Sequence, residues 1–559
     1  MYRDTAAPAA DQPIQPIAQS HRKVILATSL GTAFEWYDFY LYGTLAPILA
    51  KQFFSNLAPA TALVFALLAF AIGFVVRPLG ALVFGRMGDL VGRKYTLLIT
   101  ILVMGLSTSV VAIVPSFAEI GVAAPVILIA LRLMQGLALG GEYGCAVVYV
   151  AEHAPPDRRG AYTGWIQTTA SLGLLLSVLV VMGTRAVLGE AEFADWGWRL
   201  PFLLSLVLLV GSIYVRMHLD ESPVFTRMRA MGKLSRAPLT EAFARWGNLK
   251  VVLVALLGLT GGQAVVWYTG QFYAQFFLVE TLKVQASTVS GLVALSLAIG
   301  APFCLFFGML SDRIGRKPII LTGFLLAALT YFPVFHALTH AANPELAAAQ
   351  AASAVVVVAD PRECTFQFNP LAVARFTSSC DLVKQTLAQA AVHHRNQVAA
   401  SGAIAQVRVG DITVEAFSGQ GLSRAEIRRH TIAFEDALGR ALVQAGYPAQ
   451  ANMERFNTPV VLALLVYLAL LVAMVYGPLA ALLVEMFPTR IRYTSMSLPY
   501  HIGNGWFGGL LPVIAFATVA QTGNMYNGLW YPVLVAGMTC VFCMVFVRDT
   551  KNGDIYAED

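Results

Sequence analysis

Apolar blocks, each long enough to cross a membrane, recur along most of the chain and are separated by short polar segments. A helix of about 20 apolar residues spans the ~30 Å hydrocarbon core of a bilayer. The pattern therefore predicts an all-α membrane protein with twelve transmembrane helices. The predicted spans are residues 24–50, 62–85, 95–115, 122–150, 160–185, 198–217, 249–280, 286–309, 318–338, 458–486, 494–519 and 529–547.

One long polar segment, residues 341–457, contains no such block. It predicts a small α+β domain inserted between helices 9 and 10. Within it, "AQVRVGDITVEAF" predicts a hairpin that turns at Gly410 and Asp411. A helix follows, with Ser423 and Glu426 as a capping box and a C-terminal stop at 446. The role of the domain stays open between gating, partner binding and a tolerated insertion.

The composition supports a membrane protein. Of the 559 residues, 57% are hydrophobic and 13% are charged, whereas soluble domains carry about 25% charged residues. The first apolar block is too long and too rich in charged and aromatic residues for a cleaved signal peptide. Residues 1–23, polar and proline-containing at their start, are expected to form a disordered cytoplasmic tail.

Basic residues give the predicted orientation. Outside the insertion there are 28 Lys and Arg, and 22 of them lie in segments that are cytoplasmic if the N-terminus is cytoplasmic. The short external loops hold only Lys51, Arg185, Arg199 and Lys283. This asymmetry predicts cytoplasmic termini and a periplasmic insertion in a bacterial inner membrane. The loop 218–248 and the tail 548–559 are then cytoplasmic.

Two motifs occur twice. "GRMGDLVGRK" begins at 85 and "GMLSDRIGRK" at 308, an offset of 308 − 85 = 223. A Glu followed seven residues later by an Arg begins at 152 and again at 485, an offset of 485 − 152 = 333. The offsets differ by 333 − 223 = 110, close to the length of the insertion. The repeat predicts two six-helix halves, at 24–217 and at 249–338 with 458–547.

These motifs, with "RLMQGLALGGEYG", resemble the major facilitator superfamily. "EWYDFYLYG", "VRPLG", "WGWRLPF", "ESPVF" and "EMFPTRIRYT" resemble its metabolite:proton symporter family. That family includes shikimate, α-ketoglutarate, citrate and proline/betaine permeases, and the resemblance covers all twelve spans but not the insertion. It implies a proton-coupled symporter, not an enzyme, that imports a small organic acid or zwitterion by alternating access and uses no cofactor.

Five charged residues lie deep within the predicted spans, away from the span ends, at a cost of roughly 2.5–3.5 kcal/mol each at the bilayer centre. They are Glu35, Asp38, Arg77, Arg132 and Glu142. Three acids face two bases, so one proton would neutralise the set. We predict proton coupling at Glu35, Asp38, Arg132 and Glu142, centred on a Glu35/Asp38–Arg132 network, with Asp38 slightly favoured as the carrier because it is nearer mid-span. A permanent ion-pair lock is the alternative, and Arg77 could serve helix packing instead.

Polar and aromatic residues predict the substrate contacts. Gln263, Trp267 and Gln271 recur every four residues, which places them on one helix face. Interhelical hydrogen bonding or interface anchoring would also explain such residues. His501 could relay a proton, although packing is the simpler role. The full predicted set is Tyr37, Gln135, Gln263, Trp267, Tyr268, Gln271, Tyr500 and Asn504.

In the resembled superfamily, the doubled loop stabilises the outward-open state by forming bonds between the two halves. The alternative is that these loops carry basic residues only because they lie on the cytoplasmic side. Glycines permit the tight turn and the basic residues hold the inner face. The residues that match this gate are Gly85, Asp89, Gly92, Arg93, Lys94, Glu152, Arg159, Gly308, Asp312, Gly315, Arg316, Lys317, Glu485 and Arg492.

Cys364 and Cys380 are the only cysteines in the insertion. An external compartment permits disulfides, so we predict that they are bonded, with two free thiols as the alternative. Drug/proton antiport and a transporter-like sensor that uses the insertion are competing functions. The expected partners are a small molecule, a proton and the lipid bilayer, without nucleic acid or bound metal, for a monomeric protein.

Overall fold

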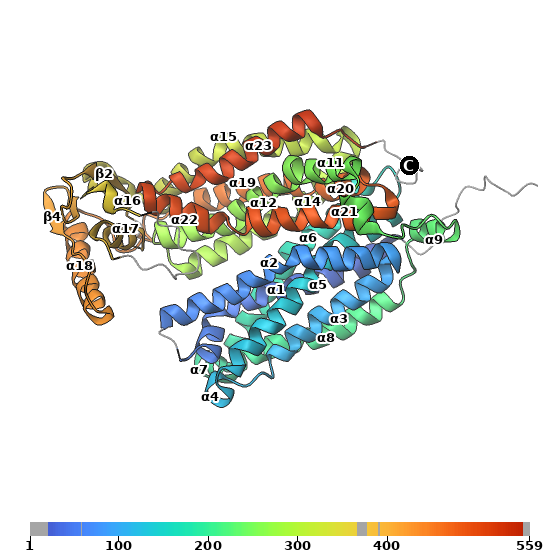
Figure 1. Cartoon of the computed structure of the whole chain (residues 1–559), viewed down its shortest axis with the longest axis horizontal. Helices are drawn as coiled ribbons and strands as arrows, with labels where there is room; N and C mark the ends of the chain where they lie inside the picture. The colour runs from blue at the N-terminus through green and yellow to red at the C-terminus, as the bar shows by residue number, and fades with distance from the viewer. Residues whose placement is uncertain (1–20, 57–58, 366–376, 390–391, 552–559) are drawn as a thin grey trace, which may run out of the picture.

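The computed structural model describes residues 21–56, 59–365, 377–389 and 392–551 of the chain. Most of them are helical, and the helices group into two bundles (Figure 1). The first bundle contains α1 (His21–Phe53), α2 (Pro59–Leu90), α3 (Arg93–Val111), α4 (Phe117–Ile120), α5 (Ala123–His153), α6 (Arg159–Leu188), α7 (Glu190–Glu192) and α8 (Arg199–Met217). Two short helices, α9 (Pro223–Ala230) and α10 (Pro238–Phe243), lead to the second bundle.

The second bundle is built from two stretches of the chain. It contains α11 (Trp246–Ala255), α12 (Gly261–Tyr268), α13 (Ala274–Phe276), α14 (Ala286–Ile314), α15 (Arg316–Ala342), α19 (Thr458–Tyr476), α20 (Leu479–Met486), α21 (Arg492–Ile502), α22 (Leu511–Thr522) and α23 (Trp530–Phe546). Two π-helical turns join α11, α12 and α13, and a third extends them into one continuous rod, Trp246–Thr281. Another π-helical turn, Gly503–Gly508, follows α21 and leads to α22.

Ten helical segments among the described residues are long and apolar enough to cross a membrane. In addition, α1 and α2 run for 33 and 32 residues beside them (Figure 1). The chain is therefore a multi-pass membrane protein. Each predicted span coincides with a helix or a run of helices, and most helices extend a few residues further at their ends. The predicted tail 1–23 lies almost wholly outside the described residues.

Glycines set the close packing of α2 on α5. A Cβ atom at Gly136 would meet the carbonyl oxygen of Gly73, and one at Gly140 would meet the carbonyl oxygen of Arg77. Gly144 continues the row, where a Cβ would meet the hydroxyl of Ser497 in the second half. The four-residue spacing of these glycines thus serves helix packing.

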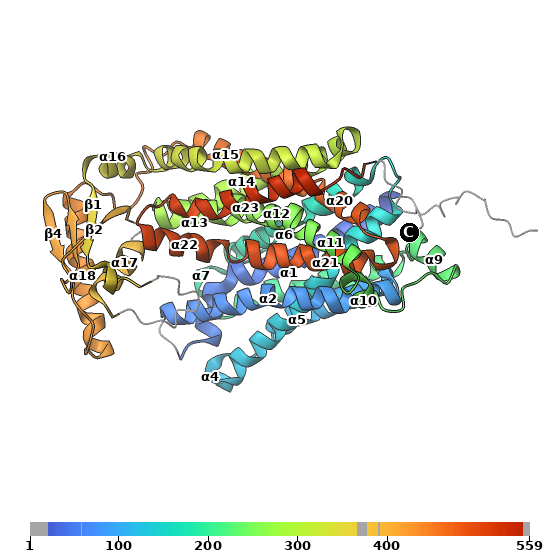
Figure 2. The same ribbon diagram turned by 45° about the horizontal axis from the view of Figure 1, so that its top comes forward.

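Between α15 and α19 lies a small domain at one end of the molecule, opposite the end that carries α9 and the C-terminus (Figure 2). It contains α16 (Pro344–Ala352), β1 (Val355–Ala359), α17 (Ser379–Gln389), β2 (His394–Val398), β3 (Gln406–Val409), β4 (Ile412–Glu415) and α18 (Arg424–Gln444). The sheet order is β2-β1-β3-β4, with β1 parallel to β2 and antiparallel to β3.

Two local predictions in this domain are confirmed. The β3–β4 hairpin turns at Gly410, whose φ of 57° lies in the left-handed region. The helix α18 begins after a capping box of Ser423 and Glu426, and Gly446 beyond its end has a φ of 84°. The predicted start at 341 differs slightly, because α15 continues to Ala342.

The domain is tied to the second bundle through the end of α22. The backbone N–H of His394 donates to the carbonyl of Gly523 at 2.8 Å. The Lys384 ammonium donates to the carbonyl of Gln521 at 3.4 Å. A cation at the C-terminal end of a helix complements the helix dipole. Cys364 and Cys380 form a disulfide within the domain, with Cα atoms 5.2 Å apart.

Candidate functional site

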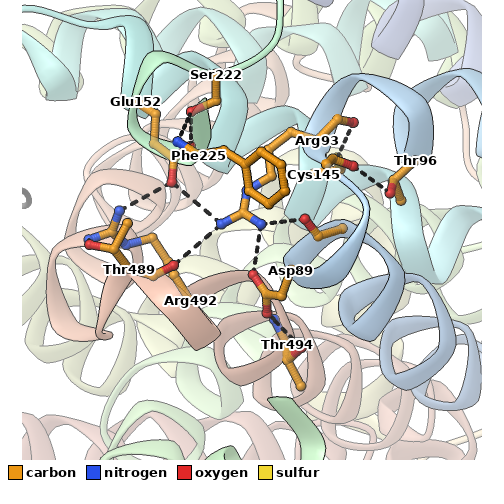
Figure 3. A network of polar contacts seen from close by, with 12 residues as sticks. Asp89, Arg93, Thr96, Cys145, Glu152, Ser222, Phe225, Thr489, Arg492 and Thr494 are labelled. Atoms are coloured by element: carbon orange, nitrogen blue, oxygen red, sulfur yellow. Dashed lines mark hydrogen bonds and ion pairs between the residues drawn. The ribbon is translucent and has the colours of Figure 1, made fainter. Parts of the chain in front are cut away.

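Charged residues close the end of the two bundles where α2 meets α21 (Figure 3). Asp89, in the last turn of α2, accepts hydrogen bonds from the backbone N and the Oγ1 of Thr494, at 2.9 and 2.7 Å. Its other oxygen lies 2.8 Å from Nη1 of Arg93. Thr494 lies in the first turn of α21, where exposed N–H groups favour an anion. Asp89 therefore holds the second half against the first.

Glu152 extends this cluster (Figure 3). Its Oε1 lies 3.7 Å from Nη2 of Arg93 and 3.2 Å from Nη1 of Arg492. The hydroxyl of Ser222, which caps α9, donates to Glu152. All of these side chains except Ser222 are charged, and all are buried. We call Asp89, Arg93, Glu152 and Arg492 the first gate cluster.

A second cluster repeats the arrangement with the halves exchanged. Asp312 at the end of α14 accepts from the backbone N of Gly160 and of Ala161, both at 2.8 Å, in the first turn of α6. Arg316 Nη1 lies 2.8 Å from Asp312. Here a carboxylate of the second half binds a helix N-terminus of the first half, the reverse of Asp89 and Thr494.

Glu485 occupies the place in the second cluster that Glu152 occupies in the first. Its Oε1 lies 3.1 Å from Nη2 of Arg316 and 3.5 Å from Nη1 of Arg159. The hydroxyl of Thr550 also donates to Glu485, at 2.6 Å. We call Asp312, Arg316, Glu485 and Arg159 the second gate cluster.

The sequence pairs Glu152 with Arg159 and Glu485 with Arg492 because each pair is seven residues apart. The structure pairs them crosswise instead: Glu152 meets Arg492, and Glu485 meets Arg159. The reason is that the Glu ends one helix and the Arg begins the next, so each points toward the facing half. Both clusters consequently bond one half to the other.

The glycines of the doubled motif have two distinct uses. Gly85 and Gly308 allow close approach: a Cβ at Gly85 would lie 3.0 Å from the Thr494 Cα. One at Gly308 would meet the carbonyl oxygen of Gly160. Gly92 and Gly315 precede the next helix with φ of 136° and 101°, a conformation that favours glycine. Substitution at any of the four would disturb the same end of the bundle.

The motif lysines also act symmetrically. Lys94 Nζ donates to the carbonyl of Met217 at 3.0 Å, and Lys317 Nζ donates to the carbonyl of Met544 at 2.9 Å. Each cation sits at the C-terminal end of a helix, α8 or α23, where the dipole is negative. Glu221, just after α8, accepts from the backbone N of Arg93 at 3.0 Å. Burial raises the pKa of Glu221, and the backbone donors around it oppose that rise.

Deeper in the first half, the residues of the predicted Glu35/Asp38–Arg132 network are joined by an arginine that the prediction did not include. Glu35 lies 3.7 Å from Nη1 of Arg216, whose Nη2 lies 2.5 Å from Glu142. Arg216 is 1% exposed. Sequence reasoning missed Arg216 because it stands at the end of α8 and was counted with the cytoplasmic charges. Its position inside the predicted span 198–217 was the available signal.

Two further contacts complete the Glu35–Arg216–Glu142 group. Thr100 of α3 donates to Glu142 at 2.6 Å, and Arg216 Nη1 donates to the carbonyl of Leu97 at 3.1 Å. Glu35 and Glu142 are both buried and face the same guanidinium, that of Arg216. Two carboxylates beside one arginine would leave a net negative charge in a buried site, which is costly. One proton on either carboxyl group would neutralise the group.

Asp38 has a different partner. Ser205 of α8 donates to its Oδ1 at 2.5 Å. Gln135 donates to Thr108 of α3 at 2.9 Å and accepts from Arg132. Arg132, Gln135 and Thr108 thus form one hydrogen-bonded chain between α5 and α3. The Arg132 guanidinium carbon also lies 3.7 Å from the ring centre of Tyr42.

Several predicted substrate residues meet where the halves face each other. Gln263 of α12 and Asn504 exchange side-chain hydrogen bonds at 3.5 and 3.2 Å. The hydroxyls of Tyr500 and Tyr476 lie 3.0 Å apart. The Tyr143 ring of the first half stacks on Tyr500 at 3.7 Å between centroids. Sequence reasoning missed Tyr143 and Tyr476, since nothing in their local pattern distinguishes them from other buried tyrosines.

The remaining predicted substrate residues divide. Trp267 faces Trp36 of the first half, with centroids 6.4 Å apart, and stands next to Tyr268. Tyr37 instead is fully buried within the first half, where its hydroxyl donates to the carbonyl of Pro201 at 2.8 Å. Gln271 does not share one face with Trp267 by four-residue spacing, because a π-helical turn spans Thr269–Tyr273. Among the described residues no group of three His, Cys, Asp or Glu could hold a metal ion.

Comparison with known proteins agrees with this architecture. Residues 24–245 match the family described as "Sugar (and other) transporter". The shikimate transporter of Escherichia coli (strain K12) is 35% identical over 326 residues, covering 57% of this chain and 72% of that protein. The proline/betaine transporter of the same strain is 35% identical over 325 residues, covering 56% of this chain and 64% of the relative, just short of two thirds.

Among solved structures, the chain is similar to the proton:xylose symporter XylE from E. coli, bound to 6-bromo-6-deoxy-D-glucose. The TM-score is 0.63 at 16% identity, and the match covers 96% of this chain and 98% of that one. At this identity the likeness is one of fold.

Proposed function

Because the chain belongs to the major facilitator superfamily, as a metabolite transporter of its sugar (and other) transporter family, we propose that it imports a small organic acid or zwitterion together with a proton. It is a transporter and not an enzyme. The observation that carries the proton coupling is the burial of two carboxyl groups, Glu35 and Glu142, beside a single arginine, Arg216.

The proposed topology has twelve transmembrane helices in two halves, 24–217 and 249–338 with 458–547, joined by the loop 218–248. The small domain, 341–457, is inserted between the ninth and tenth helices and is periplasmic, while the tails 1–23 and 548–559 are cytoplasmic. Support comes from the concentration of basic residues at the end that carries the gate clusters. The protein is proposed to act as a monomer in a bacterial inner membrane.

In this orientation the two gate clusters close the cytoplasmic end, so the described conformation faces outward. Asp89 of the first half binds the N-terminus of α21 in the second half, and Asp312 of the second half binds the N-terminus of α6 in the first half. The Glu152–Arg492 and Glu485–Arg159 ion pairs also cross between the halves. Opening toward the cytoplasm must break all of these contacts. Rocking of the halves about a central site then delivers the solute inward.

The proton would reside on Glu35 or Glu142. Without it, two carboxylates would share one guanidinium and leave a buried negative charge, which is costly. Release of the proton would repel the two carboxylates and shift the packing of α1, α5 and α8, which carry Glu35, Glu142 and Arg216. Asp38, which accepts a hydrogen bond from Ser205, is the alternative carrier.

The solute would bind where the halves face each other. Gln263 and Asn504 offer amide donors and acceptors there, and Trp267, Tyr268 and Tyr500 provide aromatic walls. These residues come from α12, α21 and the π-helical turn after α21, all in the second half. A site between repeats is where alternating access requires a substrate.

Uptake into proteoliposomes under an imposed pH gradient tests this function. Labelled shikimate, α-ketoglutarate, citrate, proline and betaine form the panel, with Glu35→Gln, Glu142→Gln and Asp38→Asn beside the wild type. We expect one solute to accumulate only with the gradient, and Glu35→Gln to keep exchange while losing accumulation. Loss of coupling in Asp38→Asn alone would show that Asp38 carries the proton. If no solute accumulates, transport is wrong, and binding of a solute by the inserted domain would support sensing.

A further inference from the structure

Arg77 is a buried cation that the mechanism above does not use. It lies in α2 just before Pro78 and is 4% exposed. Its guanidinium carbon lies 4.4 Å from the ring centre of Phe39 and 4.2 Å from that of Phe74. Both rings cover the flat faces of the guanidinium and leave its edge for hydrogen bonds.

That edge is not used within the part of the chain that the structure describes. The Nε and Nη2 atoms of Arg77 have no hydrogen-bond partner there, and no carboxylate there lies within ion-pairing distance. Five other buried arginines each meet a carboxylate at 3.5 Å or less: Arg93, Arg159, Arg216, Arg316 and Arg492. Arg132, which is also buried, donates to Gln135.

The surroundings of Arg77 come from both halves. Of the two rings against its guanidinium, Phe39 packs on Tyr40 of α1 with ring centroids 5.5 Å apart, and Phe74 packs on Tyr268 of α12 with centroids 6.2 Å apart. The Tyr40 hydroxyl also has no hydrogen-bond partner among the described residues. In the ribbon, α2 lies alongside α21 of the second half (Figure 1). The unpartnered donors therefore lie at the boundary that alternating access opens and closes.

The buried charges of the first half away from the gate clusters also leave room for an anion. Three acids and three bases form this set: Glu35, Asp38, Glu142, Arg77, Arg132 and Arg216. With one proton held by Glu35 or Glu142, the set carries one net positive charge. Arg216 sits between the two glutamates and Arg132 donates to Gln135, so the excess falls on Arg77.

We propose that Arg77 binds the carboxylate of the transported solute and so anchors it between the two halves. This inference rests on the proposed symport. An unpaired guanidinium in a buried site is costly, and a carboxylate binds it with two parallel hydrogen bonds. Tyr40 would donate a further hydrogen bond. The loaded site, with one proton and one carboxylate, is then neutral overall, which favours the movement of the halves.

The experiment uses the full-length protein in proteoliposomes and adds choline and xylose, which lack a carboxylate, to the uptake panel. The variants are Arg77→Gln and Arg77→Lys, with Arg229→Gln in the exposed helix α9 as a matched loss of charge. Thermal unfolding in detergent establishes that each variant is folded. Solute exchange measured without a pH gradient reports solute binding separately from proton coupling.

We expect the wild type to take up a carboxylate solute and Arg77→Gln to raise the half-saturating concentration for exchange by about 100-fold or more. Arg77→Lys should recover part of the loss, and Arg229→Gln should match the wild type. Exchange unchanged in a folded Arg77→Gln variant, or uptake of choline or xylose in place of a carboxylate, would overturn this inference while transport stands. Uptake of no probe by the wild type would overturn both.

Discussion

Arg492 Nη1 lies 3.2 Å from Oε1 of Glu152 in the other half of the molecule, and Arg159 lies 3.5 Å from Glu485 in the reverse sense. Neither arginine pairs with the glutamate seven residues before it in sequence. The contact of Asp89 with α21 and the contact of Asp312 with α6 show the same symmetry. In both pairs of contacts, the second contact repeats the first with the two halves exchanged. Closure of this end therefore depends on four ties that cross between halves.

Because Glu152 pairs with Arg492 across the halves, a reversed charge at one of them should be compensated by a reversed charge at the other. Glu152→Arg should lose uptake, because it places like charges against Arg93 and Arg492 at a buried site, where breaking one pair costs roughly 3–5 kcal/mol. Adding Arg492→Glu should restore part of the uptake, whereas adding Arg159→Glu should not. Initial uptake rates in proteoliposomes measure this, with protein amounts matched. Rescue by Arg159→Glu instead would show that the in-sequence pair is the functional one.

Close approach at Gly308 predicts a conformational effect of a single methyl group. Gly308→Ala should hold the gate end apart, because the new Cβ would meet the Gly160 carbonyl; overpacking of this kind costs about 1–3 kcal/mol. Labelling of a cysteine introduced near the gate should become at least several-fold faster. Gly291→Ala, on the same helix α14 with nothing within 4 Å of its Cβ, is the control. Equal labelling rates in the two variants would contradict the gate assignment.

Arg216 should be essential to the stability of the first half. Arg216→Gln leaves Glu35 and Glu142 without their cation, and we expect the free energy of unfolding to fall by roughly 3–5 kcal/mol. The double variant with Glu142→Gln should regain part of it, since one carboxylate is then removed. Denaturant unfolding in detergent micelles, with Arg229→Gln as the exposed control, gives both values. A double variant less stable than the sum of the single changes would refute this pairing.

The inserted domain should loosen in acid. Burial lowers the pKa of His394 to about 4, and the nearby Lys384 and His393 charges act in the same direction. The unfolded chain binds a proton near the ordinary value of 6.5, so the folded domain loses stability as the pH falls from about 6.5 toward 4. The loss reaches about 3 kcal/mol at most.

Hydrogen exchange of β2 at pH 7 and pH 5 measures this loss in the full-length protein after correction for intrinsic exchange rates. His394→Gln should remove most of the pH dependence, whereas His430→Gln, at an exposed position of α18, should leave it unchanged. Equal protection at the two pH values in the wild type would contradict a neutral, buried His394.

The Cys364–Cys380 bond makes a simple prediction for thiol labelling. The two sulfurs should resist a thiol reagent in the unfolded, unreduced protein, whereas the free Cys145 and Cys304 should react. The bond closes a loop of sequence separation 16, which the chain-entropy account values at about 3 kcal/mol. The Cys364→Ser, Cys380→Ser variant should therefore show faster exchange in the inserted domain. Labelling of all six cysteines without reductant would exclude the disulfide.

The sequence by itself determined the helices, the repeat and the inserted domain. A membrane helix satisfies its own backbone, so its apolar length is visible in the chain regardless of its neighbours. Local signals were equally sufficient for the hairpin at Gly410 and the capping box at Ser423. The gate motif occurs twice, at an offset of 308 − 85 = 223 residues, and it indicated the residues that close one end of the bundles.

Only the tertiary structure decided which charges meet. Arg216 stands at the end of a span, where a charge usually faces water, yet it lies buried between Glu35 and Glu142 because α8 packs against α1 and α5. Glu152 and Arg159 are neighbours in sequence but end and begin different helices, so each pairs with the opposite half. A contact between side chains depends on which helix faces are brought together, and hydropathy and spacing describe each helix alone.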